Sequence, residues 1–480
     1  MMNTKALRQK ILDLAIHGKL VPQDPNDEPA SVLLERIKAE KERLIKEGKI
    51  KRTKRSKAAC DKPHYPFELP EGWEWCKLED IVSFGGGKTP SMSVRQYWEN
   101  GTNLWVTSKD MKKERINDSL MKITDAALEG MNIYEKGTIL VVTRSGILKH
   151  TLPLAILVKK ATVNQDLKTI SPYMLSLSEY LYFAIKANEK EILANYHKDG
   201  TTVDSIDFDK FRCLPIALPP MYEQERIVKC IKYWFSLIES IEENRDKLQE
   251  VIKQTKSKIL DLAIHGKLVP QDPSDEPASE LLERINPKAE ITCDNPQYEN
   301  LPNGWCECTL GSLFLFIRNG INIRQDKSKI GYPITRIETI SSEFIDRSRM
   351  GYAAITEENY SDYYLQKNDI LMSHINSPIH VGKCALCDIK AGEKIIHGMN
   401  LLCLRPYPDI EAKFILIVFK SPYFKNEIRP FIKNAVNQAS INIRNLSSVH
   451  LYLPPVSEQH RIVAKIEELF TQLDKIEVSL

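Results

Sequence analysis

A chain of 480 residues is too long for a single compact core, because one domain typically holds about 100–200 residues. Hydrophobic residues make up 42% of the chain and charged residues 27%, which excludes a disordered or collagen-like protein. The 67 basic and 64 acidic residues leave a net charge of only +3, so binding to a polyanion would depend on local clusters of charge.

Several features bear on where the protein resides. Even one of the longest apolar runs, residues 414–419, is far too short to span a membrane. The first ten residues lack the apolar core of a secretion signal. Ten cysteines are spread thinly along the chain. We therefore expect a cytoplasmic protein with free thiols.

The N-terminal region, residues 1–62, is predicted to be helical with a basic linker. Leu7, Ile11 and Leu14 lie at heptad spacing, and the His-Gly pair at residues 17–18 indicates a left-handed cap at the helix end. A short helix is expected to open at residues 29–31 and to end near Arg36.

The segment 49–62 then holds seven Lys or Arg against one Asp, and either a solvated linker or a phosphate contact explains it. The insertion at residues 38–62 has no counterpart later in the chain, so its role stays open.

The first globular domain is predicted at residues 63–215 as a mixed α/β fold. Strands are expected at 138–142 and 154–158. The sequence FGGGKT at residues 84–89 is not a phosphate-binding loop, because Val82 stands where such a loop requires its first glycine. A glycine-rich turn close to a polyanion is the better interpretation.

The region 216–294 is predicted to be a long helical spacer. Residues recur at alternating spacings of four and three from Ile227 onward, which is typical of a coiled-coil seam. Over residues 227–262 this helix would be about 54 Å long at 1.5 Å per residue. The predicted apolar seam consists of Ile227, Ile231, Trp234, Ile238, Ile241, Leu248, Ile252, Ile259 and Leu262.

A second globular domain is predicted at residues 295–452, with strands at 370–373 and 401–404. Its landmarks parallel those of the first domain while the polar residues differ: 105–110 corresponds to 334–339, 141–146 to 372–377, and 163–166 to 397–400. The last region, 453–480, continues the seam. Its predicted seam residues are Ile462, Ile466, Leu469, Leu473 and Ile476.

An internal repeat relates the two halves. KILDLAIHGKLVPQDPNDEPASVLLERI at 10–37 recurs at 258–285 with only two substitutions. LPEGW at 69–73 recurs as LPNGW at 301–305, and LPPMYEQERIV at 218–228 recurs as LPPVSEQHRIV at 453–463. The order of the three repeats is the same in both halves, which indicates a duplication.

The register of the repeat predicts how the chain ends pack. It aligns Leu480 with Arg245 and Met1 with Gln249, so the two terminal helices together rebuild a copy of the central helix. We expect a circularly permuted repeat of α+β class, with an antiparallel coiled coil and pseudo-two-fold symmetry. The alternative is that each helix packs only on its own globular domain.

Motifs for catalysis or metal binding are largely absent. Cys384 and Cys387 form one CxxC without a second pair at zinc spacing, and Cys306 and Cys308 have no further ligands nearby in sequence. His17 and His265 are predicted to cap helices, and Trp73 and Trp305 to be core residues. The sequence lacks the Asn-Pro-Pro-aromatic motif of amino-methyltransferases, helicase motifs and a paired-acid nuclease motif.

The repeated motifs, together with the GGKTPS loop at 86–91, resemble the DNA-specificity subunit of type I restriction–modification enzymes. The resemblance covers nearly the whole chain. It implies that each globular domain reads one half of a split, asymmetric site in double-stranded DNA. The long helices would act as the spacer between the half-sites, where one turn of DNA is about 34–36 Å.

The resemblance also implies partners. Two modification subunits carrying S-adenosylmethionine would dock on the helical regions, and restriction subunits would add ATP- and Mg-dependent translocation and cleavage. This chain would itself be non-catalytic and bind no cofactor or metal. Two rival hypotheses remain: a self-contained DNA methyltransferase, and a coiled-coil adaptor with no role in DNA binding.

Candidate readers follow from base-edge chemistry, because Arg or Lys suits guanine and Asn or Gln suits adenine. Each could equally hold a loop or touch phosphate. In the first domain they are Lys88, Thr89, Thr107, Lys109, Arg144, Ser145, Asn164, Gln165 and Lys168. In the second domain they are Arg318, Asn319, Arg324, Arg336, His374, Asn376 and Asn400.

Overall fold

The computed structural model describes residues 3–50, 52, 67–198, 204–292, 301–326, 329–355, 360–377, 380–435 and 438–480. Most of the basic segment 49–62 lies outside these residues. Two compact units divide the chain within one helix: the N-terminal unit is Met2–Asn244 and the C-terminal unit is Arg245–Leu480. That helix, α7 (Met221–Ile264), is 44 residues long, which confirms the predicted central helix.

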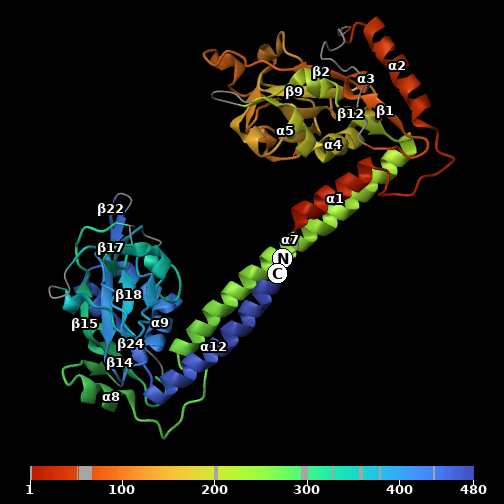
Figure 1. Cartoon of the computed structure of the whole chain (residues 1–480). Helices are drawn as coiled ribbons and strands as arrows, with labels where there is room; N and C mark the ends of the chain where they lie inside the picture. The colour runs from red at the N-terminus through yellow and green to blue at the C-terminus, as the bar shows by residue number, and fades with distance from the viewer. Residues whose placement is uncertain are drawn as a thin grey trace. The chain divides into compact units, whose positions relative to one another are not determined.

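In the N-terminal unit, helix α1 (Thr4–Ile16) lies along the first half of α7 (Figure 1). Arg8 forms an ion pair with Glu242 at 2.8 Å, and Asp27, farther along the chain, pairs with Arg226 at 2.6 Å. The residue number rises from Arg8 to Asp27, whereas the number of the partner in α7 falls from 242 to 226. The two segments therefore run antiparallel, as predicted.

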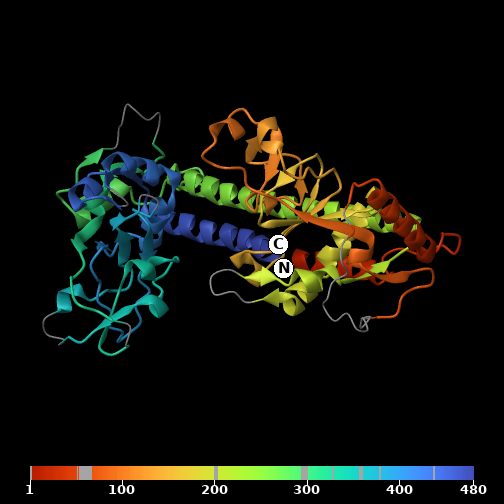
Figure 2. The ribbon, with the colours of Figure 1, turned by 90° about the horizontal axis from the view of Figure 1, so that it is seen from above.

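In the C-terminal unit, helix α12 (Val456–Ser479) packs in the same way along the second half of α7 (Figure 2). Lys256 pairs with Asp474 at 2.6 Å, and Asp275 pairs with Arg461 at 2.6 Å. The two ends of the chain therefore each supply one antiparallel partner to one half of α7.

Most residues of the predicted seam are buried or half-buried, and five are exposed. Ile11, Ile227, Ile231, Ile238, Ile252, Ile259, Ile462 and Ile466 are buried. Leu14, Leu262, Leu469 and Leu473 are half-buried. Leu7, Trp234, Ile241, Leu248 and Ile476 are instead exposed.

Trp234 is 43% exposed because its neighbour Phe235 occupies the buried position. Phe235 lies edge-on to Phe183 of α4 (Ser178–Ala187), with 6.0 Å between ring centroids, and the guanidinium of Arg8 lies 5.2 Å above its ring. Contacts with α4 and with Arg8 of α1 thus bury Phe235 in place of Trp234, while Ile231 and Ile238 on either side keep their predicted burial.

The globular part of the N-terminal unit contains a five-stranded sheet in the order β2-β9-β6-β7-β4. The smaller sheets are β5-β3-β8, β1-β12 and β10-β11. The strands are β1 (Glu74–Lys77), β2 (Val82–Gly86), β3 (Asn103–Val106), β4 (Arg115–Ile116), β5 (Met121–Ile123), β6 (Ile139–Val142), β7 (Leu154–Leu157), β8 (Thr162–Val163), β9 (Leu167–Pro172), β10 (His197–Lys198), β11 (Ser205–Ile206) and β12 (Pro215–Leu218). The further helices are α2 (Ala30–Lys46), α3 (Leu78–Ile81), α5 (Glu189–Asn195) and α6 (Phe208–Arg212).

The C-terminal unit repeats this scaffold with a four-stranded sheet in the order β15-β21-β18-β20. Its smaller sheets are β13-β14-β24, β16-β17 and β19-β23-β22. The strands are β13 (Ile291–Thr292), β14 (Cys306–Thr309), β15 (Phe314–Asn319), β16 (Tyr332–Ile334), β17 (Gly351–Ala353), β18 (Ile370–Ser373), β19 (Ile375–Asn376), β20 (Cys384–Leu386), β21 (Leu401–Pro406), β22 (Lys433–Ala435), β23 (Gln438–Ser440) and β24 (His450–Leu453). The further helices are α8 (Ala278–Ile285), α9 (Ala412–Lys420), α10 (Pro422–Ile428) and α11 (Ile443–Ser447).

Strand pairing confirms the landmarks predicted to correspond. Val142 pairs with Leu167 in one unit, and Ser373 pairs with Leu401 in the other. In each globular domain the strand after the LPxGW motif pairs with the last strand, β1 with β12 and β14 with β24. The closing strand β12 runs to Leu218, so it extends past the predicted domain boundary at residue 215.

The helices after the two caps differ in length. Helix α8 ends at Ile285, because Pro287 follows closely. Helix α2 continues to Lys46 instead of ending near Arg36, because residues 38–46 are good helix formers with ion pairs such as Arg43–Glu40 at 2.6 Å. Part of the insertion is therefore an extension of this helix.

The repeated motifs meet at a polar junction in the N-terminal unit. Trp73 Nε1 donates to Glu223 Oε2 at 3.0 Å, and Gln23 Nε2 donates to Glu223 Oε1 at 3.1 Å. Gly18 has φ +65°, which confirms the left-handed cap, and a Cβ there would lie 2.3 Å from the Pro70 ring. The helix cap, the LPEGW motif and the start of α7 therefore form one packed unit.

The C-terminal unit reproduces this junction. Trp305 Nε1 donates to Glu458 Oε2 at 3.0 Å, and Gln271 Nε2 donates to Glu458 Oε1 at 3.3 Å. Gly266 has φ +63°, and its Cβ would lie 2.5 Å from Pro302. Trp73 and Trp305 are buried, as predicted, and His17 and His265 contact helix-end carbonyl groups through Nδ1.

The cysteines are mostly as expected. Cys306, Cys308, Cys384 and Cys387 are free and buried. The expectation of free thiols is wrong at Cys213, directly after α6, which is disulfide-bonded. Among the described helices there is none whose length and apolarity would suit a membrane span.

The buried carboxyl groups of Glu223 and Glu458 should make the stability of the protein depend on pH. Burial raises the pKa of Glu223 and of Glu458 above 4.5. Their stabilising contribution is therefore complete below pH 4.5 and is lost as the pH rises through the folded-state pKa. Urea unfolding should measure the free energy of unfolding of the double variant Glu223→Gln/Glu458→Gln and of the unaltered chain. The value for the variant minus the value for the unaltered chain should increase as the pH rises from 4.5 to 8. A pH-independent difference would contradict this prediction.

Candidate nucleic-acid interface

Eight of the nine candidate readers of the first domain follow strand ends at one end of the five-stranded sheet and the adjoining β5-β3-β8 sheet, and Lys168 is the second residue of β9. Gly86, the last residue of β2, pairs with Lys168 in β9, and the last residue of β6 pairs with Leu167. Strands β3 and β8 run parallel and end together at Val106 and Val163. The topology therefore gathers the predicted residues along one edge, which we call the first reading edge.

Gly87 shapes the first reading edge. A Cβ at this position would lie 1.6 Å from the carbonyl oxygen of Val163, so only glycine allows the two backbones to approach. Lys88 N then donates to Val163 O at 3.1 Å, and the Thr89 hydroxyl hydrogen-bonds to Gln165. The glycine-rich turn thus places two candidate segments side by side.

The side chains at the first reading edge divide into exposed and inward-turned groups. Asn164 is buried and donates to Asp166 Oδ2 at 2.9 Å, and Thr107 donates to Asp110 Oδ2 at 2.9 Å. Ser145 caps a short 3-10 helix. These three hold the loops. The exposed candidates are Lys88, Thr89, Lys109, Arg144 and Gln165, and the ammonium of Lys168 lies 5.7 Å above the ring of Phe208.

The second domain has the same construction. Asn319, the last residue of β15, pairs with Leu402, and Ser373 at the end of β18 pairs with Leu401. A Cβ on Gly320 would lie 2.0 Å from the carbonyl oxygen of Gly398, and Ile321 N donates to His397 O at 3.1 Å. We call this end of the sheet the second reading edge.

The candidates at the second reading edge also differ in their freedom. Asn319 and Arg324 are exposed, whereas Arg318 lies 3.9 Å above the Phe316 ring and donates to Asp362 O at 2.8 Å. Arg336 Nε lies 3.5 Å from a carboxylate oxygen of Glu338. In separate contacts, Asn376 donates to Ser373 Oγ at 3.2 Å and Asn400 adopts φ +73°.

Two histidines at the second reading edge are buried. Burial lowers the pKa of His374 and of His397, so both rings favour the neutral form. They do not form a metal site with His380: the described residues contain no group of three or more potential ligands. His374 therefore contributes to the shape of the edge and carries little positive charge.

The geometry also identifies Asn322, which the sequence interpretation missed. Ile321 makes the hydrogen bond that Lys88 makes in the first domain, so the exposed Asn322 corresponds to Thr89. Aligning the chain on Gly87 and Gly320 would have found it. Its amide can pair with adenine in the same way as the other amide candidates.

The close glycine contacts predict a matched set of substitutions. Gly87→Ala and Gly320→Ala should each lower the free energy of unfolding by about 1–3 kcal/mol, because the added methyl group overpacks against a backbone carbonyl. Gly146→Ala is the control, since no atom lies within 4 Å of its added Cβ. Urea denaturation would measure all three, and equal effects would refute the close-approach argument.

Comparisons with known proteins agree with this architecture. The family model of the type I restriction modification DNA specificity domain matches residues 70–250 and 302–478. The type I restriction enzyme EcoAI specificity subunit of Escherichia coli is 30% identical over 98% of this chain and 90% of that protein. The EcoEI specificity subunit of Escherichia coli is 26% identical over 99% and 90%.

One solved structure extends the likeness to the fold. A chain from a structural study of the complex assembly and conformational transition of the type I R-M system has a TM-score of 0.56 and 18% identity, covering 86% of this chain and 94% of that chain. The family model matches two segments that together make up most of the sequence. This chain therefore belongs to the family of type I restriction–modification DNA specificity proteins.

Proposed function

We propose that this chain is the DNA-recognition subunit of a type I restriction–modification complex and reads a bipartite, asymmetric site. The observation that carries the proposal is the pair of reading edges. One strand scaffold occurs twice, with the same close glycine contact, while the side chains at its tips differ. Two dissimilar readers on one chain suit a target whose halves have different sequences.

The chemistry of the exposed tips fits contact with duplex DNA. Lys88, Lys109 and Arg144 in the first domain can bind guanine or phosphate, and Gln165 can bind adenine. In the second domain Arg324 is exposed and Asn319 and Asn322 offer amide groups. Each reading edge therefore combines cations, which attract the phosphates, with groups that can discriminate between bases.

Helix α7 supports the proposed roles of spacer and docking surface. Trp234 and Ile241 lie seven residues apart on the part of α7 in the N-terminal unit, and both are exposed, as is Leu248 on the part in the C-terminal unit. Leu237 and Val251 are exposed as well. An amphipathic helix of a modification subunit would cover such exposed apolar residues. We propose two modification subunits as its partners, with restriction subunits joining the complex.

The proposal assigns no chemical step to this chain. S-adenosylmethionine, ATP and Mg would be bound by the partner subunits, and the complex would act on DNA in the cytoplasm. The reading edges present Lys, Arg, Asn, Gln and Thr side chains, which recognise DNA without transferring a group to it. This chain would determine where the complex acts.

An exchange of one domain tests the bipartite proposal. Replacing residues 67–218 with the equivalent segment of another family member keeps β1 and β12 together, because these strands close the domain. In the assembled complex only one half of the methylated sequence should change. Exchange of residues 306–453, which keeps β14 with β24, should change only the other half. A change in both halves from either exchange would contradict the proposal.

Single substitutions test the reading edges. Gln165→Ala and Arg336→Ala should each weaken discrimination at one position, in different half-sites, by about 1–3 kcal/mol when a bidentate contact is removed. Competition binding with oligonucleotides altered at single base pairs would measure the change.

Two controls make this test specific. Gln472→Ala removes an exposed amide from α12, outside both globular domains, and should leave discrimination unchanged. Asn164→Ala should reduce stability more than selectivity, because its side chain is buried against Asp166. Uniform loss of affinity for all sequences would show that Gln165 and Arg336 contact phosphate instead.

A further inference from the structure

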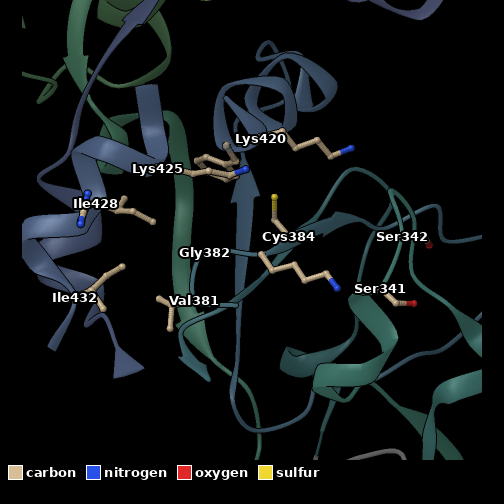
Figure 3. A pocket seen from close by; sticks show the side chains of 12 residues that line it. Ser341, Ser342, Val381, Gly382, Cys384, Lys420, Lys425, Ile428 and Ile432 are labelled. Carbon is tan, nitrogen blue, oxygen red and sulfur yellow. The ribbon is translucent and has the colours of Figure 1, made fainter. Parts of the chain in front are cut away.

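A basic pocket of about 610 Å³ opens beside the four-stranded sheet of the second domain (Figure 3). Lys420 and Lys425, from α9 and α10, lie on one side, and Val381 and Cys384 lie across from them. Lys383, Arg429, Ser341 and Ser342 also line it, and the Ser342 hydroxyl donates to Phe344 O at 2.7 Å. Its volume is within the range of ligand-binding clefts, about 300–1,000 Å³.

The pocket is strongly electropositive. Four of its lining residues are cations and none is an acid. Glu343 lies outside the lining, with its carboxylate 3.8 Å from Lys420 Nζ. Among the described residues, Lys383, Lys425 and Arg429 form no ion pair within 4.0 Å, and all three are exposed. Burial raises the pKa of the Cys384 thiol to about 12, so this group adds no negative charge.

The first domain has a cavity at the corresponding place, and its charge is different. Strand β7 pairs with β6 in the first domain as β20 pairs with β18 in the second. On its other side, β7 pairs in parallel with β4, which begins at Arg115, and Phe344 takes the equivalent place beside β20. This counterpart cavity measures about 190 Å³.

Two acids line the counterpart cavity, Glu114 and Glu189. Lys186 is paired with Glu114, and Glu189 Oε1 accepts hydrogen bonds from the Thr151 hydroxyl and Leu152 N, both at 2.7 Å. Both acids of the counterpart cavity therefore have partners within it. The second domain has an enlarged pocket with an excess of cations at the same position in the scaffold.

The basic pocket adjoins the second reading edge. Ser373 precedes the candidate reader His374. Its backbone N–H donates to Lys383 O at 2.8 Å, and Gly382 N donates to Ser373 O at 2.8 Å. Strand β20 therefore begins at the end of the sheet that carries the candidate readers. A ligand in the pocket would lie beside that edge and would meet several ammonium and guanidinium groups at once.

We propose that this pocket binds a phosphate group and that its counterpart in the first domain does not. The lysine and arginine side chains are donors typical of phosphate recognition, and the unpaired cations favour a doubly charged or bridging anion. The phosphate belongs either to the DNA backbone flanking the second half-site or to a free phosphate compound. Only the DNA source rests on the function proposed above.

The experiment compares the full-length chain with two variants. Lys425→Gln/Arg429→Gln removes two exposed pocket cations, and Lys383→Gln removes a third from a different element. Lys112→Gln is the matched control, an exposed lysine that lines the counterpart cavity. Calorimetry with inorganic phosphate measures the free anion, and filter binding to duplex DNA at several salt concentrations measures the backbone contacts.

The two measurements distinguish the sources. If the source is DNA, the pocket variants should reduce the slope of log affinity against log salt by about 1 for each DNA phosphate that is no longer bound, and Lys112→Gln should not. If the source is a free phosphate compound, they should weaken inorganic phosphate binding at least tenfold and leave the slope unchanged. No change in either measurement would overturn the inference. Phosphate binding that depends on the pocket, in a chain that does not bind DNA, would instead refute only the proposed function.

Discussion

The hydrogen bond between a buried tryptophan and a buried glutamate holds each half of this protein together. Trp73 begins the first globular domain and Glu223 lies in the first turn of α7, so the 3.0 Å contact ties the start of the domain to the helix that leaves it. Trp305 and Glu458 do the same in the second half. A buried carboxyl group requires such partners, because an unsatisfied polar group is costly in the interior.

This junction explains why the repeated motifs lie far apart in the sequence yet keep the same residues. The helix cap, the LPxGW segment and the LPPxxEQ segment pack against one another at one junction. A change in any of them removes contacts from the other two. At the strand ends of the globular domains the close contacts of Gly87 and Gly320 are constrained, whereas the exposed side chains beside them are not. The framework can therefore stay constant while the tips vary, which is what a pair of different DNA readers requires.

The comparison of the two scaffolds shows how duplication allows charge to diverge. At the same position beside the sheet, one copy pairs Lys186 with Glu114, whereas the other leaves the equivalent carboxylate of Glu343 3.8 Å from Lys420 and adds further cations. The strand pairing around this position is common to both domains, so side chains of different charge occupy equivalent places. The two domains therefore need not contact a polyanion in the same way.

Sequence alone determined the duplication, the long central helix, its antiparallel partners and two strands in each main sheet (β6, β7, β18 and β21), because periodicity and repeats can be read directly from the order of residues. It also placed the candidate readers near strand ends. Only the tertiary structure decided which of them are available: Asn164 turns inward to Asp166, Gln165 beside it is exposed, and Asn322 corresponds to Thr89. It likewise decided that Phe235 and not Trp234 is buried. The direction and burial of a side chain depend on neighbours that are distant in sequence, such as Phe183 against α7, and no local pattern records them.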